Sequence, residues 1–313
     1  MLRRETTLWF LFFVTCLSAG YLRGILPETR LSFFWYQPEE VKVLVYSDKL
    51  FPDFLVGDLE QRTHTKIQLD VSNSYNDFLA RSVSQSGYYM FVLPRLWSES
   101  LSRQGLLLQL AGLKSFFQKI LHPDFPSLKS QIFPWAWIPT LFVTKVNTNL
   151  KDISSIAIVE EEDHLYQVLK KIPRPQPQVE LRVQSLLEEA DEISDNQLKE
   201  VNYFYREDYG LVKSPEGWPK SLFLFDVVIP RRTPRQTTSI ALLKNLFSSG
   251  HLSLELGELP FGVTTKTLDQ TALFPFEKKP SALRNQAMKG LIVTQAIDIA
   301  EREHFLNSFN LKR

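Results

Sequence analysis

The chain has 313 residues, of which 44% are hydrophobic and 12% aromatic, enough for one large or two medium hydrophobic cores. Its 36 Lys and Arg balance 35 Asp and Glu, and the net charge of +1 excludes a long-range field that would favour nucleic acid or strongly acidic partners. Binding chemistry must therefore be local. We find no internal repeat of fixed period and expect two lobes.

The N-terminus has the features of an export signal. Two arginines precede an apolar run from Leu8 to Leu17, and small residues follow it. This order predicts a signal peptide in residues 1–25, cleaved before Tyr21, with an uncleaved membrane anchor as the alternative. We expect a periplasmic protein, held at the inner membrane in the second case. Cys16 is the only cysteine, so no internal disulfide can form, and we interpret it as a filler of the apolar segment.

The first third of the chain alternates strand-like and helix-like segments with short connections. This order predicts a parallel sheet covered by helices. The expected strands cover residues 41–46, 66–70 and 88–94, and the expected helices cover 54–63 and 76–85.

The rest of the chain continues with mixed elements. Acidic residues 160–163 favour a helix start, because they oppose the positive end of the helix dipole. The expected elements are a short helix over 97–105, a crossover near 134–139 that leads into an apolar strand, a strand over 153–159, a helix through 165–172, a proline-rich break at 173–178, a buried strand over 222–230, a helix over 235–246 and an amphipathic helix over 292–309.

Four short segments in this order resemble one family. They are Leu59–Thr63, Tyr88–Arg95, the strand end Asp226–Pro230 and the turn Gly257–Gly262. Together they resemble extracytoplasmic solute-binding proteins of the spermidine/putrescine type, which deliver ligand to ABC importers. The resemblance extends over nearly everything from residue 41 to residue 309.

The resemblance implies a fold and a division into lobes. The fold would be the two-lobed α/β fold of type II periplasmic binding proteins, with two mixed sheets flanked by helices and a ligand cleft between the lobes. Lobe one would comprise residues 40–136 and 231–313, and lobe two residues 137–230. The partners implied are a polyamine or similar small ligand and the permease subunits of an ABC transporter, and no nucleic acid.

Two acidic positions are candidates for binding an amine. Asp226 interrupts an apolar strand, where an unpaired carboxylate would be costly, so it needs a partner. The resemblance makes that partner a ligand ammonium group, and the alternative is a structural carboxylate bonded to backbone amides or an arginine. Glu161 lies where the family carries further acidic contacts, while the neighbouring His164 replaces a glutamate of the family.

Aromatic rings would form the walls of the site, because polyamines pack against ring faces. The candidates are Trp97, which falls on a tyrosine position of the family, and Tyr46, Tyr75 and Tyr205 near strand ends. Arg95 departs from the family, which has serine there. An arginine would repel an amine unless it pairs with Asp226 or turns outward.

The sequence gives no support to an enzyme, and we expect no catalytic residue, cofactor or metal. The five histidines lack paired metal spacing, and residues 301–304 are typical of a solvated helix face. Two alternatives stay open beside the polyamine receptor. One is a receptor for another, possibly anionic, solute because of Arg95. The other is a degenerate, membrane-anchored interaction protein, which a salt-bridged cleft would favour.

Overall fold

The computed structural model describes most of the chain after residue 37, and residues 41–313 form one compact unit. The described residues are 15, 38–84, 87–121, 130–172, 179–187, 193–202, 212–248, 261–265, 291–293, 295, 297–308 and 311–312. The predicted signal peptide or anchor, including Cys16, lies outside them apart from Thr15. Among the helices within these ranges, none combines the length and the hydropathy that a membrane crossing requires.

Within the described residues, twelve strands belong to one sheet system. Their bounds are β1 (Glu39–Val45), β2 (Thr65–Val71), β3 (Tyr88–Pro94), β4 (Phe133–Lys145), β5 (Ser155–Val159), β6 (Glu180–Gln184), β7 (Gln197–Asn202), β8 (Val212–Lys213), β9 (Lys220–Val228), β10 (Gly262–Val263), β11 (Leu291–Val293) and β12 (Leu311–Lys312).

Helices lie between the strands in sequence. The α-helices are α2 (Asp53–Thr63), α3 (Tyr75–Ser84), α4 (Arg95–Arg103), α5 (Lys114–Ile120), α6 (Glu162–Lys171), α7 (Gln236–Ser248) and α10 (Ile299–Leu306), and the short 3-10 turns are η2 (Asp48–Leu50), η3 (Ala111–Leu113) and η4 (Leu150–Asp152).

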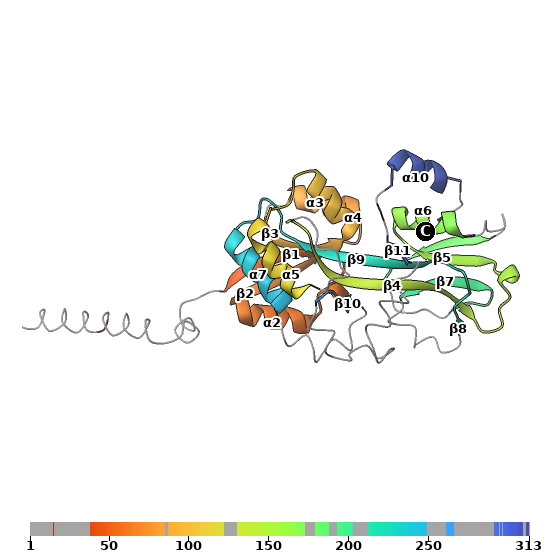
Figure 1. Ribbon diagram of the computed structural model, residues 1–313, viewed down its shortest axis with the longest axis horizontal. Helices are drawn as coiled ribbons and strands as arrows, with labels where there is room; N and C mark the ends of the chain where they lie inside the picture. Colours follow the sequence, from red (N-terminus) through yellow and green to blue (C-terminus); the bar gives the residue numbers. More distant parts are fainter. Residues whose placement is uncertain are drawn as a thin grey trace, which may run out of the picture. The chain divides into compact units, whose positions relative to one another are not determined.

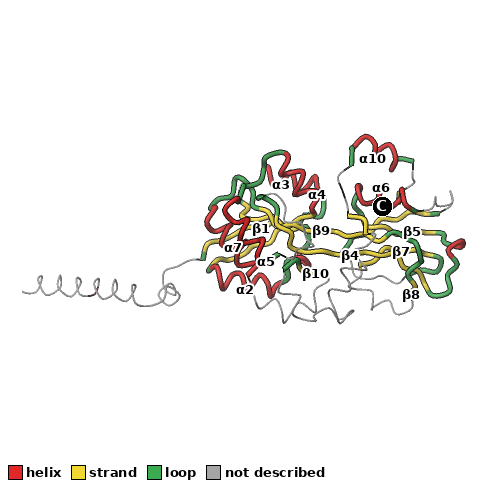
Figure 2. Tube along the Cα trace, in the orientation of Figure 1, coloured by secondary structure: helices red, strands yellow, loops and turns green. Residues whose placement is uncertain are grey.

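The strand order is β12-β6-β5-β7-β4-β9-β3-β1-β2. The pairs β1–β3 and β5–β6 are parallel, whereas β4 is antiparallel to both β7 and β9. Figures 1 and 2 show β4 and β9 running between a group of helices that includes α2, α3, α4, α5 and α7 and a second group of α6 and α10. The α/β class with flanking helices is confirmed. The two predicted sheets are continuous, because the long strands β4 and β9 belong to both.

The hydrophobic cores follow the alternation of side chains along the strands. Val43 and Val45 of β1 belong to a core with α2 and α7, while Leu44 between them belongs to a core with α3 and α4. Successive strand residues point to opposite faces, so helices cover both faces of this part of the sheet. A separate core joins β5, β6, α6 and Leu306 of α10.

The C-terminal residues depart from the expected single helix over 292–309. Leu291–Val293 pair with β9 as strand β11, and the helix α10 starts only at Ile299. Asp298 caps it by accepting hydrogen bonds from the backbone N–H groups of Ala300 and Glu301. The prediction was therefore too long at its start, because the cap and the strand pairing were not recognised.

The division into lobes stays a prediction. The strands β4 (133–145) and β9 (220–228) extend from one group of helices to the other, as expected for crossover strands. The last residues, which the prediction gave to lobe one, contact elements that it gave to lobe two, since α10 contacts α6 and β12 pairs with β6.

Candidate functional site

A pocket lies where the carboxyl ends of parallel strands from both parts of the sheet meet. Its walls come from the ends of β1, β3, β5 and β6 and from the middle of β9, the arrangement in which α/β sheets commonly bind ligands. The lining residues are Tyr46, Pro94, Arg95, Leu96, Val159, Glu161, Leu186, Leu222, Phe223, Leu224 and Phe225. Three predicted site residues, Tyr46, Arg95 and Glu161, are among them.

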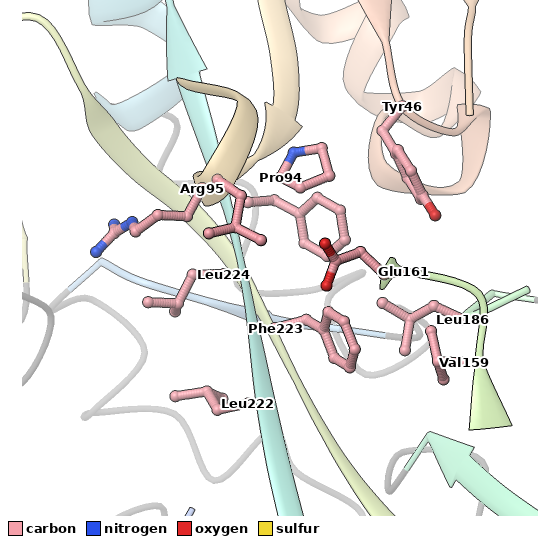
Figure 3. A pocket seen from close by; sticks show the side chains of 11 residues that line it. Tyr46, Pro94, Arg95, Val159, Glu161, Leu186, Leu222, Phe223 and Leu224 are labelled. Atoms are coloured by element: carbon pink, nitrogen blue, oxygen red, sulfur yellow. The ribbon is translucent and has the colours of Figure 1, made fainter. Parts of the chain in front are cut away.

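Among the described residues that line the pocket, Glu161 is the one carboxylate. It is the N-cap of α6, where its Oε2 accepts a hydrogen bond of 2.8 Å from the backbone N–H of His164. Burial raises the pKa of the Glu161 carboxyl to about 7, while the His164 ring acts in the opposite direction and Asp163 in the same one. Figure 3 shows this carboxylate pointing towards the middle of the lining residues. Glu161 is therefore a carboxylate that a cation in the pocket could stabilise.

Tyr46 forms an aromatic wall next to this carboxylate. Its ring lies 5.5 Å from those of Phe225 and Trp97, measured between ring centroids. Burial, and after it the charges of Glu161 and Glu160, raise the pKa of the Tyr46 hydroxyl to about 12. The phenol thus stays protonated and can donate a hydrogen bond at neutral pH.

Arg95 and Asp226 pair with each other. The guanidinium donates from Nη2 to Oδ1 at 2.7 Å and from Nε to Oδ2 at 3.2 Å, and Ser98 Oγ donates to Oδ2 at 2.5 Å. Asp226 is fully buried and Arg95 is 8% exposed. Figure 3 shows the Arg95 guanidinium pointing away from Glu161 and Tyr46. The alternative in which Asp226 is bound to an arginine therefore describes this arrangement.

Two other predicted aromatic residues, Trp97 and Tyr75, lie behind the pocket wall. Trp97 is buried and packs against both Tyr46 and Tyr75, and it is not among the lining residues. The Tyr75 hydroxyl shares a hydrogen bond of 2.8 Å with Ser100 Oγ of α4, so it already has a partner outside the pocket. Tyr205 lies outside the described residues.

A second buried polar pair, His164 and Glu200, lies next to the pocket wall. His164 Nε2 lies 2.9 Å from both carboxylate oxygens of Glu200, which also accept from Thr140 Oγ1 at 2.5 Å and from the Val159 backbone N–H at 3.0 Å. The His164 ring packs against the pocket residue Phe223 at 4.6 Å between centroids. His164 is thus buried in support of the pocket wall rather than lining it.

The pocket is small in this conformation. Its cavity volume is about 20 Å³, enough for a single water. Lys49 Nζ donates to the Leu187 carbonyl at 2.7 Å, and Leu186 and Leu187 are buried in the core that contains β1 and α2.

Sequence reasoning missed several residues of this region. Leu186 and Phe223 look like ordinary core residues in the sequence, and only their place at the pocket distinguishes them. Glu200 lies in the segment Gln197–Asn202, whose polar residues gave no sign that all six are buried. Within the described ranges, no group of three or more His, Cys, Asp and Glu side chains is placed to hold a metal ion.

Comparison with solved structures identifies the fold. The spermidine/putrescine ABC transporter substrate-binding protein of Streptococcus pneumoniae matches with a TM-score of 0.63 and 14% identity over 86% of this chain and 97% of that chain. A putative spermidine/putrescine ABC transporter protein of Listeria monocytogenes gives 0.63 and 12% over the same shares. The apo ferric ion-binding protein A of Pasteurella haemolytica gives 0.56 and 11% over 75% and 88%.

No family model and no curated protein sequence matches this chain. The structural matches cover almost the whole length of the solved proteins, so the fold of substrate-binding proteins is confirmed as predicted. At these identities the likeness extends to the fold alone.

Proposed function

We propose that this protein binds a small amine, polyamine-like in chemistry, in the pocket at Glu161 and delivers it to the permease subunits of an ABC importer. The observation that carries the proposal is a carboxylate directed into an aromatic pocket at strand ends, on a fold shared with substrate-binding proteins. The proposed location is outside the cytoplasm, with residues 1–25 as a signal peptide or as an anchor in the inner membrane.

The chemistry of the lining residues suits one ammonium group with an apolar body. Glu161 would accept a charge-assisted hydrogen bond, which is stronger than a neutral one. The rings of Tyr46, Phe223 and Phe225 line the same space and favour both a cation and aliphatic carbons. Asp226 contributes no second acidic contact in this arrangement, because its two oxygens already accept from Arg95 and Ser98.

Binding would couple to an opening motion. A polyamine does not fit into about 20 Å³, so the Lys49–Leu187 contact and the apolar contacts of Leu186 would have to separate before entry. The long strands β4 and β9 connect the two groups of helices and are the natural place for a hinge.

The proposal predicts that amine binding strengthens as the pH rises through about 7. The carboxyl of Glu161 is half protonated there, and only the carboxylate attracts an ammonium group. Calorimetric titration with putrescine and spermidine between pH 5.5 and pH 8.5 measures this. Below pH 7 we expect the affinity to fall about tenfold per pH unit, as for a single required deprotonation.

Glu161→Gln should weaken amine binding by about 1.5 to 3 kcal/mol at pH 8, the usual contribution of a hydrogen bond to a charged group, and should remove the pH dependence. Glu160→Gln is the matched control, because this neighbour is exposed and does not line the pocket. If the unaltered protein binds neither amine at any pH, the amine proposal is wrong.

A second candidate is a membrane-anchored interaction protein that keeps the fold without transporting a solute. The internal Arg95–Asp226 pair and the small cavity favour it. The same titrations, extended to amino acids and small anions, separate the two candidate functions. An interaction protein should bind none of these solutes. An anionic solute is disfavoured, because Arg95 directs both Nε and Nη2 to Asp226.

A further inference from the structure

The C-terminal helix α10 is bound to the first turn of α6 by one arginine. Arg302 Nη2 lies 2.7 Å from Glu162 Oε2, and Arg302 Nη1 lies 3.0 Å from Asp163 Oδ1. The Arg302 side chain is only 16% exposed. The expectation that residues 301–304 form a solvated face is therefore wrong for Arg302, because α10 turns this residue towards α6.

Further contacts fix α10 in this place. The rings of Phe305 and Tyr166 pack at 4.9 Å between centroids, and Leu306 is buried in the core that α6 shares with β5. Lys170 Nζ also pairs with Glu301 Oε1 at 3.0 Å. These contacts lie along α6, so Arg302 is held over its N-terminal end.

The N-terminal end of α6 carries the pocket carboxylate. Glu161 is the N-cap, directly before the two carboxylates that Arg302 binds. We propose that Arg302 is a positioning residue of the solute site: by pairing with Glu162 and Asp163 it fixes the first turn of α6 and compensates their charge, and so presents Glu161 to the pocket as a carboxylate. This inference rests on the proposed function.

The charged and titratable groups near Glu161 determine the expected direction. Asp163 and Glu160 belong to its own segment, His164 follows one turn later in α6, and Tyr46 faces it from the end of β1. The negative charge of Asp163 raises the pKa of Glu161, and Arg302 is the cation that offsets Asp163. Loss of the Arg302 charge should therefore raise the pKa of Glu161 further.

This shift can be measured without any ligand. Because the pKa of Glu161 is raised in the folded protein, its ionisation lowers the free energy of unfolding as the pH rises from about 4.5 to about 7. The difference in unfolding free energy between Glu161→Gln and the unaltered protein should rise over this window and level off above it. The pH at which it levels off reports the pKa of Glu161.

The test measures the difference in unfolding free energy caused by Glu161→Gln, as a curve against pH, in three further variants of the protein. In Arg302→Gln we expect the curve to move to higher pH by about half a unit or more, as for the loss of a nearby opposite charge. Arg302→Lys, which keeps the charge, should restore the original position. Arg182→Gln is the matched control, since this arginine pairs with Glu180 on β6 at 56% exposure, and it should leave the curve in place. An unshifted curve in Arg302→Gln overturns the proposal.

A second variant guards against a failure of Arg302→Gln to fold. Glu162→Gln removes a carboxylate that is 53% exposed, so the variant should fold. Arg302 then loses one of its two negative partners, and more of its positive charge acts on Glu161. The curve should then move to lower pH, and no movement also contradicts the proposal. Putrescine titrations on the same variants should show the same shifts in their pH midpoint. If the stability curves shift while no variant binds putrescine, the inference about Arg302 stands and the amine function fails.

Discussion

Asp226→Asn is expected to lower the free energy of unfolding by about 3 to 5 kcal/mol, equally with and without spermidine, as for the removal of one partner from a buried ion pair. The carboxylate is fully buried, and its oxygens accept from Arg95 and Ser98. An asparagine keeps the shape but leaves the Arg95 guanidinium buried without its counter-charge. Denaturant unfolding at pH 7 gives the difference directly.

Two comparisons separate this effect from a general loss of charge. Asp77→Asn removes a partly exposed carboxylate from an i,i+4 pair with Arg81, so it should change the free energy of unfolding far less than Asp226→Asn does. Replacing both partners with apolar residues, Arg95→Met with Asp226→Leu, should recover most of the stability, because no charge is then left unpaired. If Asp226→Asn instead weakens spermidine binding at unchanged stability, Asp226 belongs to the ligand and not to Arg95.

Asp226 could be identified from the sequence as a carboxylate that needs a partner, because it interrupts an apolar strand. A carboxylate in an apolar strand must have a partner, and that requirement can be read from the residues of β9 alone. The identity of the partner could not be read in the same way, since Arg95 is 131 residues away and meets Asp226 only because β3 and β9 are neighbours. The prediction therefore left open a ligand ammonium group, backbone amides and an arginine as the partner of Asp226.

Two of the residues predicted at the ends of elements line the pocket, and a third, Tyr75, does not. Tyr46 and Glu161 were predicted from a strand end and a helix start, and both line the pocket. Trp97 was placed by resemblance, but a wide ring in α4 gains more from the core between Tyr75 and Phe78 than from an open wall. Local patterns thus located the site, while packing decided which side chains face it.

Buried polar residues away from the strand ends were missed. Glu200 follows Lys199 in β7, and such a polar strand is typical of an exposed edge. In the fold β7 is not an edge strand, since it lies between β4 and β5, and all six of its residues are buried. No pattern within six residues carries that information, because it depends on the strand order of the whole sheet.

Glu200→Gln is expected to be as damaging as Asp226→Asn, with a loss of about 3 to 5 kcal/mol at pH 7. Its carboxylate accepts from Thr140 Oγ1, from the Val159 backbone N–H and from the His164 ring, and an amide can accept with only one of its two polar atoms. Burial alone would raise the pKa of Glu200, but His164 and these hydrogen bonds together hold that pKa below its usual value.

The direction of this pKa shift fixes how the effect depends on pH. A carboxyl with a lowered pKa in the folded protein contributes stability above its unfolded pKa of about 4.5 and loses it as the pH falls through the folded value. The loss caused by Glu200→Gln should therefore be full at pH 7 and shrink in strongly acidic solution. Denaturant unfolding at pH 7, 4 and 3 measures it, with Glu99→Gln, from a partly exposed pair with Arg103, as the control. A loss below about 1 kcal/mol at pH 7 would mean that the pair does not support the pocket wall at Phe223.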